Sequence, residues 1–357
     1  MTYGTVVADQ IQNTTGYSLG AGNASIMKNR VINGEFKISQ YNGSSSVNNV
    51  AAANTYAIDR FAYYSTVATQ FAIQQNAGSV TPPTGFVNYL GITNGASAYT
   101  PVAASLIVLD HQIEAYNVSD LGYGTANAKT CTLSFYVYSS LTGTFGGTIQ
   151  NGAQSRAYGF TYTVSVANTW TFISVTIPGD TSGSWATNNN TRGISINWNL
   201  GCGSTFNTTA GTWQTGQYFG VTGTVNLVST ANATFYITGV QFEVGSIATG
   251  FEYRNYQQEL ALCMRYYQTL PYQTLTAGAY STNSVSFRAY PFIVMRAAPT
   301  ATYTGTTVEW VGVSTPTISS TSNSSFANKI QVDFSFTPAI TPYVPMGSPA
   351  IQLSAEL

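Results

Sequence analysis

Charged side chains are scarce in this sequence. Only 7% of its 357 residues are charged, and its 12 basic residues are nearly balanced by 13 acidic ones. A strong positive field is what draws a protein to nucleic acid or to an anionic membrane surface, and so little charge cannot create one. We therefore expect no nucleic-acid partner.

Histidine and cysteine are also scarce. A Ser-His-Asp triad or a histidine-rich metal centre would depend on His111, the only histidine, for which a structural role is the simpler expectation. Cys131, Cys202 and Cys263 are widely separated, odd in number and form no CxxC pair. This pattern indicates buried free thiols rather than a disulfide framework or a zinc site. We expect no cofactor.

Long apolar runs are missing as well. No stretch reaches the length of about 18 consecutive apolar residues that a membrane-spanning helix needs. The N-terminal sequence MTYGTVVADQ has neither a basic start nor a continuous apolar segment. The sequence therefore predicts no membrane insertion and no export signal.

Aromatic and small polar residues are abundant. Hydrophobic residues make up 44% of the chain, with 25 Tyr, 18 Phe and 5 Trp, which is enough to bury a sizeable core. The polar remainder is mainly Ser, Thr, Asn and Gly, which disfavour exposed helices and favour strands joined by tight turns. We predict an all-β protein with two domains.

Short alternating segments predict the strands of the larger domain. Leu133, Phe135 and Val137 share one face of a strand, while Ser134 and Tyr136 share the other. Turn clusters such as TPPTG and PGDTSG separate segments of this kind. Many short strands with Gly, Pro and Asn turns predict a β-sandwich or a jelly roll, and periodicity alone leaves both open.

The stretch from Ile237 onward predicts the end of this domain. In ITGVQFEV, Val240 and Phe242 share one face, whereas Gln241 and Glu243 point to the opposite one, as in a half-buried strand. Gly245 then ends the strand.

A short helix is predicted next, because Leu260, Met264 and Tyr267 recur at helical spacing. Alternating segments follow it to the C-terminus. Residues 1–26 are polar and contain too few apolar residues to form a core, so they are either a frayed end or an anchor that orders on a partner. We divide the chain into an N-terminal extended anchoring arm (1–27), a β-sandwich (28–255), a short docking helix or linker (256–269) and a smaller C-terminal β domain (270–357).

Weak surface charge also predicts an assembly. Unpaired strand edges associate readily when charge does not keep molecules apart, so we expect neighbouring copies to cover them. The expected partner is the chain itself, as a homo-oligomer and specifically a trimer. No heptad or collagen-like repeat is present, so a coiled coil would not hold such a trimer together.

Carboxylates suited to catalysis are few. Asp110, Gln112 and Glu114 would share one face of a strand, about 7 Å apart in succession, with His111 on the other face. Glycan hydrolysis needs two carboxylates about 5 to 10 Å apart. A polar strand face or a buried network explains the same pattern more simply. We assign no catalytic residue and predict that the protein is not an enzyme.

Two tryptophans are candidates for sugar recognition without catalysis. Trp185 and Trp213 lie in the loop-like segments GSWATNNN and GTWQTG. Flat apolar rings flanked by hydrogen-bonding side chains suit the faces of pyranose rings. The alternative is that both rings cap the end of the sandwich core.

Several motifs resemble one family of proteins. They are MKNRVINGEFKISQ (Met27–Gln40), YAIDRF (Tyr56–Phe61), LDHQIEAYNVSDL (Leu109–Leu121), TLSFYVYSSLTGTF (Thr132–Phe145), NTWTFISVTIPGDTSGSW (Asn168–Trp185), GTWQTG (Gly211–Gly216), FIVMRAAPT (Phe292–Thr300) and the closing IQLSAEL. Together with the stretch after Ile237, they resemble bacteriophage tail-fibre, head-fibre and related appendage proteins built on a carbohydrate-binding-module-like jelly roll.

The resemblance implies a jelly roll for the larger domain and a location in the virion. It also implies a non-enzymatic structural part of a phage particle, a tail or head fibre or appendage that contacts other virion proteins through its N-terminal arm. The alternative function is a glycan-binding adhesin module that mediates attachment to a host surface glycan. The sequence does not distinguish head from tail.

The resemblance also raises the question of a metal. NGEF (Asn33–Phe36) is similar to the opening strand of calcium-bearing carbohydrate-binding modules, whose last strand, here QFEV, contributes oxygen ligands. Glu35 and Glu243 would then converge as weak calcium candidates. Lys37 stands where those modules commonly carry a carboxylate and would repel a divalent ion. We therefore expect no metal.

Overall fold

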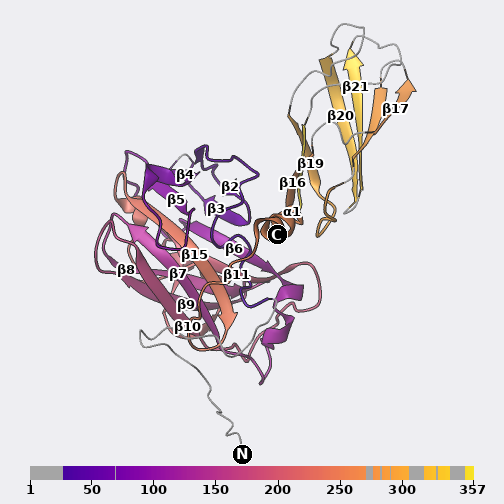
Figure 1. Cartoon of the computed structure of the whole chain (residues 1–357). Coiled ribbons are helices and arrows are strands. Elements are labelled where there is room, and N and C mark those ends of the chain that lie inside the picture. Colours follow the sequence, from indigo (N-terminus) through magenta and orange to yellow (C-terminus); the bar gives the residue numbers. More distant parts are fainter. Residues whose placement is uncertain are drawn as a thin grey trace, which may run out of the picture. The chain divides into compact units, whose positions relative to one another are not determined.

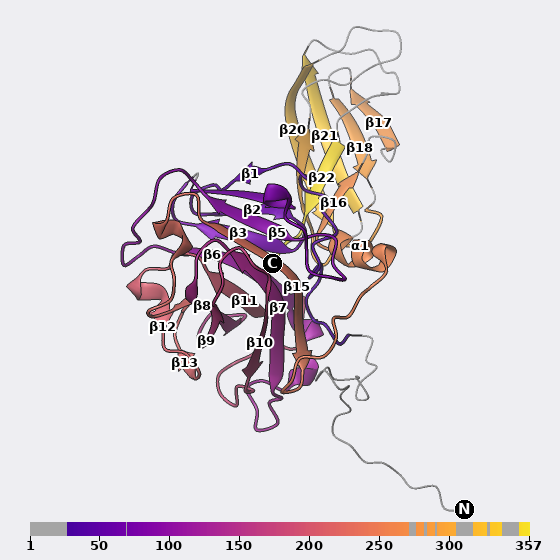
Figure 2. The ribbon, with the colours of Figure 1, turned by 60° about the vertical axis from the view of Figure 1, so that its left-hand side comes forward.

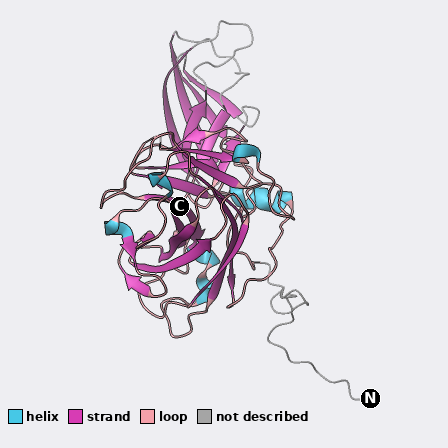
Figure 3. Ribbon diagram, turned by 90° about the vertical axis from the view of Figure 1, so that its left-hand side faces the viewer, coloured by secondary structure: helices cyan, strands magenta, loops and turns pink. Residues whose placement is uncertain are grey.

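The computed structural model describes residues 27–68, 70–270, 276–281, 284–289, 291–304, 317–326, 329–337 and 350–357. It divides into two compact units, Met1–Arg254 and Asn255–Leu357. The predicted N-terminal arm lies outside the described residues except for Met27. Strands predominate in both units, and the helices are few and short (Figure 3). The prediction of an all-β protein is confirmed.

The first unit is a sandwich of two antiparallel sheets (Figure 1). The six-stranded sheet contains, in spatial order, β1 (Val47–Asn48), β4 (Phe71–Gln75), β5 (Leu90–Asn94), β15 (Thr234–Val244), β7 (Cys131–Ser139) and β10 (Thr171–Ile177). The seven-stranded sheet contains β13 (Trp213–Thr215), β9 (Arg156–Val164), β8 (Gly143–Asn151), β11 (Arg192–Asn199), β6 (Ile107–Glu114), β3 (Phe61–Ser65) and β2 (Ala53–Ile58).

The chain passes repeatedly from one sheet to the other, for example from β5 to β6, from β6 to β7 and from β10 to β11. This connectivity is that of a jelly roll, as the resemblance implies. A short parallel pair, β12 (Asn207–Thr208) and β14 (Gly220–Val221), lies in the connections, as do five 3₁₀ turns among the residues that the structure describes. The turns are η1 (Ala77–Ser79), η2 (Ala115–Asn117), η3 (Ser119–Leu121), η4 (Ser204–Phe206) and η5 (Leu227–Ser229).

The core lies between the two sheets. Leu133, Phe135 and Val137 on β7 are fully buried, as their alternation predicts. Phe135 meets Trp198 of β11 edge to face, with ring centroids 5.8 Å apart. Aromatic pairs of this geometry contribute about 0.5–1.5 kcal/mol beyond the burial of their surface. The two sheets are therefore joined by large rings.

The second unit begins with the helix α1 (Tyr256–Met264). Its first turn is capped by Asn255, whose side chain accepts a hydrogen bond from the Gln258 amide at 2.8 Å. The predicted extension of the helix through Tyr267 is wrong. Tyr267 begins strand β16 (Tyr267–Leu270) and pairs with Ser354, because backbone pairing in a sheet replaces helical spacing there. The contacts place the helix in the second unit rather than in a separate linker.

Two small sheets complete the second unit. A three-stranded sheet consists of β16, β22 (Ala350–Ser354) and β19 (Thr300–Thr304). A four-stranded sheet consists of β17 (Thr276–Ser281), β18 (Ser284–Ala289), β21 (Lys329–Thr337) and β20 (Thr317–Phe326), and Figure 2 shows these strands side by side. A smaller C-terminal β domain follows the helix, as predicted. Among the described residues, no helix is both long and apolar enough to cross a bilayer.

Candidate functional site

The outward face of β7 and β10 carries a group of aromatic and hydroxyl side chains. Residues alternate between the two faces of a strand, so Ser134 and Tyr136 point away from the core that Phe135 enters. On β10, Phe172 is paired with Tyr136 and Ser174 with Ser134. The Tyr136 and Phe172 rings lie 5.1 Å apart. These four side chains form the floor of a pocket.

Two loops supply the walls of the pocket. Phe86 comes from the segment between η1 and β5, and Phe251 and Tyr253 come from the segment that follows β15. The Phe86 ring lies 5.1 Å from Phe251, 5.8 Å from Tyr253 and 5.6 Å from Tyr136. Phe86 therefore joins the loop that follows β15 to the floor.

Gly239 on β15 allows this ring to approach the sheet. Its φ of 63° lies in the left-handed region, which glycine adopts without a steric penalty. A Cβ atom built on Gly239 would lie 2.7 Å from the Phe86 ring. The Phe86 side chain therefore rests directly on the backbone of the strand.

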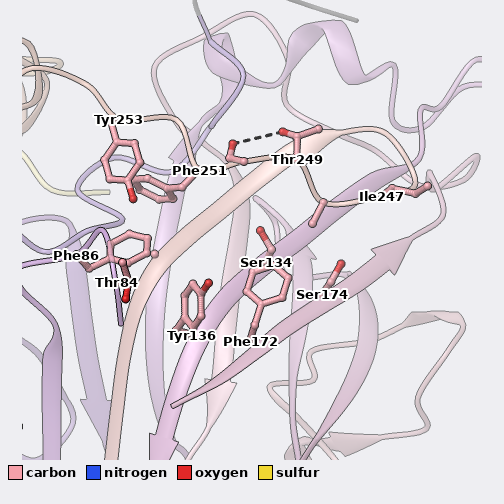
Figure 4. A pocket seen from close by; sticks show the side chains of 13 residues that line it. Thr84, Phe86, Ser134, Tyr136, Phe172, Ser174, Ile247, Thr249, Phe251 and Tyr253 are labelled. Carbon is pink, nitrogen blue, oxygen red and sulfur yellow. Dashed lines mark hydrogen bonds between the residues drawn. The ribbon is translucent and has the colours of Figure 1, made fainter. Parts of the chain in front are cut away.

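The space enclosed has a volume of about 440 Å³ (Figure 4). Its lining includes five aromatic rings and four serine or threonine side chains: Phe86, Tyr136, Phe172, Phe251 and Tyr253, and Thr84, Ser134, Ser174 and Thr249. None of the lining residues is charged. Burial, and secondarily the charge of Glu35, raises the pKa of Tyr253, so its hydroxyl keeps its proton at neutral pH.

The rim of the pocket exposes large apolar side chains to solvent. Phe172 is 49% exposed, Ile247 48% and Tyr253 55%, and Val87 beside Phe86 is 80% exposed. Contiguous exposed apolar residues with polar neighbours mark binding sites more often than single ones do. The pocket therefore has the size and lining of a small-molecule site.

The two predicted sugar-binding tryptophans lie elsewhere. The structure brings Trp185 and Trp213 together, with ring centroids 5.5 Å apart and planes at 88°, and Tyr123 lies 4.8 Å from Trp185. Their indole N–H groups donate to the carbonyls of Ser182 and Pro178. Both rings are half-buried and pack against the core of the sandwich. Neither lines the pocket.

The polar residues of β6 form part of a buried layer on the seven-stranded sheet. Asp110 accepts a hydrogen bond from Gln112 at 2.5 Å, and both are 8% exposed. Glu114 is 1% exposed. Burial, opposed by the Gln112 hydrogen bond, raises the pKa of Asp110 to about 6. Such side chains are inaccessible to a polymeric substrate.

His111 points to the other face of β6, as predicted. It is 1% exposed, and its Nδ1 lies 3.1 Å from the carbonyl of Arg60. Burial lowers the pKa of this imidazole, and the charge of Arg60 acts in the same direction. The ring is therefore neutral at physiological pH and serves the core.

The calcium candidates are held by protein donors. Glu35 forms an ion pair with Lys37, which also donates to the carbonyl of Arg254. Glu243 accepts hydrogen bonds from Gln241 and Thr249. Within the part of the chain that the structure describes, no group of three or more His, Cys, Asp or Glu side chains could hold a metal ion.

Sequence reasoning missed most of the pocket. The pattern does indicate Ser134 and Tyr136, because alternation along β7 places them on the outward face of the sheet. Phe86, Phe251 and Tyr253 stand in irregular segments, where no periodicity indicates which rings will meet. Only the folded chain brings them onto Tyr136.

Comparisons with known proteins give no family for this chain. No family model matches the sequence, and no curated protein matches it. A putative sugar binding protein from Bacteroides thetaiotaomicron is 14% identical with a TM-score of 0.33, and the alignment covers 61% of this chain and 100% of that one. A CBM4 structure is 15% identical with a TM-score of 0.30, and the alignment covers 60% of this chain and 99% of that one.

One further match is to the enzymatically active domain of tailspike protein 4 from bacteriophage CBA120. It is 13% identical with a TM-score of 0.31, and the alignment covers 61% of this chain but only 22% of the tailspike chain. At these identities and TM-scores, the likenesses carry no inference about ligand or activity. Any function must be argued from the site itself.

Proposed function

We propose that this protein binds glycans without catalysis and that the aromatic pocket on the six-stranded sheet takes the sugar. The observation that carries the proposal is the combination of five aromatic rings with four serine or threonine side chains and no charge in one cavity. Sugar rings have apolar C–H faces that pack on aromatic rings and equatorial hydroxyls that need hydrogen-bond partners. The lining supplies both.

The absence of charge in the lining argues for a neutral glycan over other ligands. Phosphate-bearing ligands are usually held by basic side chains or by helix N-termini, and the lining contains no basic residue. A purely apolar ligand would leave the lining hydroxyls of Thr84, Ser134 and Ser174 without use. An uncharged oligosaccharide satisfies both parts of the lining.

The proposal excludes hydrolysis of that glycan. General acid and base catalysis would require two carboxylates beside the bound sugar, and the lining has none. Asp110 and Glu114 belong to the opposite sheet, where they are buried. An assay for new reducing ends on the bound glycan should give no signal above that of heat-denatured protein. If the wild-type protein instead releases reducing ends, and the double variant Asp110→Asn/Glu114→Gln does not, the claim that the protein lacks hydrolytic activity is wrong.

The test of binding is a screen on immobilised glycans, followed by affinity measurements on the best ligand. Phe172→Ala should weaken binding about two- to thirteenfold, since one aromatic contact contributes about 0.5–1.5 kcal/mol. Tyr116→Ala is the matched control, because Tyr116 is similarly exposed, at 56%, but lies outside the pocket lining. Equal affinity of the Phe172→Ala and wild-type proteins, or no bound glycan at all, would contradict the proposal.

We further propose that the protein acts as an appendage of a phage particle, as a homo-oligomer held to other virion proteins by its N-terminal segment. The support is the set of sequence motifs similar to tail-fibre and head-fibre proteins, together with the low charge of a chain rich in strand edges. Antibody labelling of particles in electron micrographs tests the location, and light scattering tests for a trimer. Particles that the antibody does not label would refute the virion location. A stable monomer in light scattering would refute the homo-oligomer.

A further inference from the structure

Glu243 lies behind the wall of the pocket. It is on β15, 1% exposed, and points to the same side of the strand as Gln241. Its carboxylate accepts three hydrogen bonds: from Gln241 Nε2 at 2.8 Å, from the Thr249 amide at 2.8 Å and from Thr249 Oγ1 at 2.6 Å. Hydrogen bonds to an ionised group are about twice as strong as neutral ones.

The segment held in this way is the wall itself. Thr249, Gly250 and Phe251 line the pocket, and Figure 4 shows Thr249 at its upper edge, close to the backbone of Gly250. Gln241 completes the attachment, because its Oε1 accepts a hydrogen bond from the Glu252 amide at 2.8 Å. Two neighbouring side chains of one strand therefore fix both ends of the run 249–252.

This run has no helix or strand geometry of its own. A segment without regular structure keeps one conformation only where specific contacts select it. Phe251 follows Thr249 by two residues, so the position of the Phe251 ring depends on the backbone that Glu243 holds. The pocket would otherwise have to order this wall when a ligand binds, which weakens binding.

We infer that Glu243 is a positioning residue of the pocket: its buried carboxylate holds the 249–252 wall in the shape that receives the sugar. This inference rests on the proposed function, because the pocket must be the binding site for the wall to matter. It assigns to Glu243 the role of a brace built from hydrogen bonds. The carboxylate is suited to this role because its oxygens accept all three bonds and offer no donor.

The test compares Glu243→Gln with wild type in two measurements. A glutamine keeps one acceptor oxygen for Gln241 and the Thr249 amide, but its NH₂ group takes the place of the oxygen that Thr249 Oγ1 donates to, so the charge-assisted hydrogen bond from this hydroxyl is lost. We expect faster amide exchange in a peptide covering 246–252, with unchanged exchange in β7. We also expect about tenfold weaker binding of the best glycan from the screen, measured on protein that remains folded.

Glu114→Gln is the matched control, since Glu114 is also a strand carboxylate that is 1% exposed but belongs to the opposite sheet. It should change stability without changing exchange at 246–252 or glycan affinity. If Glu243→Gln fails to fold, Thr249→Val and Thr249→Ser replace it, because only the serine keeps the hydroxyl donor. Faster exchange at 246–252 in the valine variant alone would support the brace, and equal exchange in both variants would refute it; affinity does not decide here, because Thr249 also lines the pocket.

The outcomes separate the inference from the proposed function. Wild-type protein that binds no glycan refutes the proposed function, whereas the exchange measurement still tests the brace. Wild-type protein that binds, together with a Glu243→Gln variant that binds equally well and exchanges equally slowly, refutes the inference alone. Weaker binding with unchanged exchange also refutes it, because the effect would then not pass through the wall.

Discussion

Asp110 should make the stability of the first unit fall as the pH rises. The side chain lies in the middle of the seven-stranded sheet, opposite Asn197 of β11. Burial raises the pKa of Asp110 from 3.8 to about 6, and the Gln112 hydrogen bond and the charges of Arg192 and Arg60 only partly oppose it. The folded chain therefore holds this proton more tightly than the unfolded chain does.

The sign follows from proton linkage. The protonated carboxyl contributes stability that is fully present below the unfolded pKa of 3.8 and is lost as the pH rises through about 6. About two pH units separate the two values, and each corresponds to about 1.4 kcal/mol, so the effect is about 3 kcal/mol. Other carboxylates superimpose their own titrations on this change.

Asp110→Asn isolates the contribution, because asparagine keeps an acceptor for Gln112 but does not titrate. Urea unfolding of both proteins, at several values from about pH 4 to about pH 7.5, gives the difference in unfolding free energy at each pH. Tryptophan fluorescence reports mainly on the first unit, which holds Trp170, Trp185, Trp198 and Trp213 of the five tryptophans.

The variant should gain about 2.5 kcal/mol relative to wild type between the two ends of this range, because a small part of the effect already lies below pH 4. Most of the gain should fall below about pH 7, where the folded carboxyl loses its proton. Parallel curves would show that Asp110 titrates with its ordinary pKa in the folded chain. A variant that loses stability relative to wild type as the pH rises would show that the folded state prefers the ionised carboxylate. Either result would refute the reasoning.

Three further predictions concern packing and charge. Leu133→Ala should lower the unfolding free energy by about 2–5 kcal/mol in urea, because Leu133 is fully buried, and a smaller loss would show that the core collapses around the cavity. Gly239→Ala should weaken glycan binding by displacing Phe86, and unchanged affinity would mean that the ring position is unimportant. Arg156→Ala removes two hydrogen bonds from the buried Asp180 and should lower the unfolding free energy, measured in urea, by about 3 kcal/mol. Adding Asp180→Asn should recover part of this loss, because no buried charge is then left unpaired. An Arg156→Ala variant as stable as wild type would contradict the prediction.

The fold was predictable from the sequence where one face of an element is apolar. The alternation of Leu133, Phe135 and Val137 indicates a strand with one buried face, because only a strand places every second residue on the same side, and all three side chains are buried. The end of the helix was not predictable, since Tyr267 fits helical spacing as well as strand alternation. Its pairing with Ser354 is a contact across 87 residues of sequence that no local pattern encodes.

The site was less predictable than the fold. Trp185 and Trp213 attracted attention because large rings in loops usually have a partner, and the structure shows each to be the other's neighbour, at 5.5 Å. Trp185 stands in a loop, as Phe86 and Phe251 do. The expected loop position of Trp213 is wrong, because Trp213 begins the edge strand β13 and pairs with Tyr158. Phe86 and Phe251 do line a cavity. What separates the two pairs is the surface beneath them. The tryptophans pack against the core, whereas Phe86 and Phe251 lie beside the outward ring of Tyr136.

One irregularity in β15 connects the core, the pocket and the brace. Phe235 and Ile237 enter the core, and strict alternation from them would also direct Gln241 and Glu243 into it. The strand instead has a bulge between Thr238 and Gln241, where its register against β7 shifts.

After the bulge, Val240 and Phe242 take the core positions, and Gln241 and Glu243 turn outward to hold the loop. The bulge contains Gly239, whose left-handed backbone receives the Phe86 ring. Removal of the bulge would therefore bury a carboxylate in the core, release the wall and displace Phe86 together. The same bulge also leaves the Val240 amide to donate to the carbonyl of Gly34, so one irregularity of β15 serves the packing of residues 29–34 as well as the pocket.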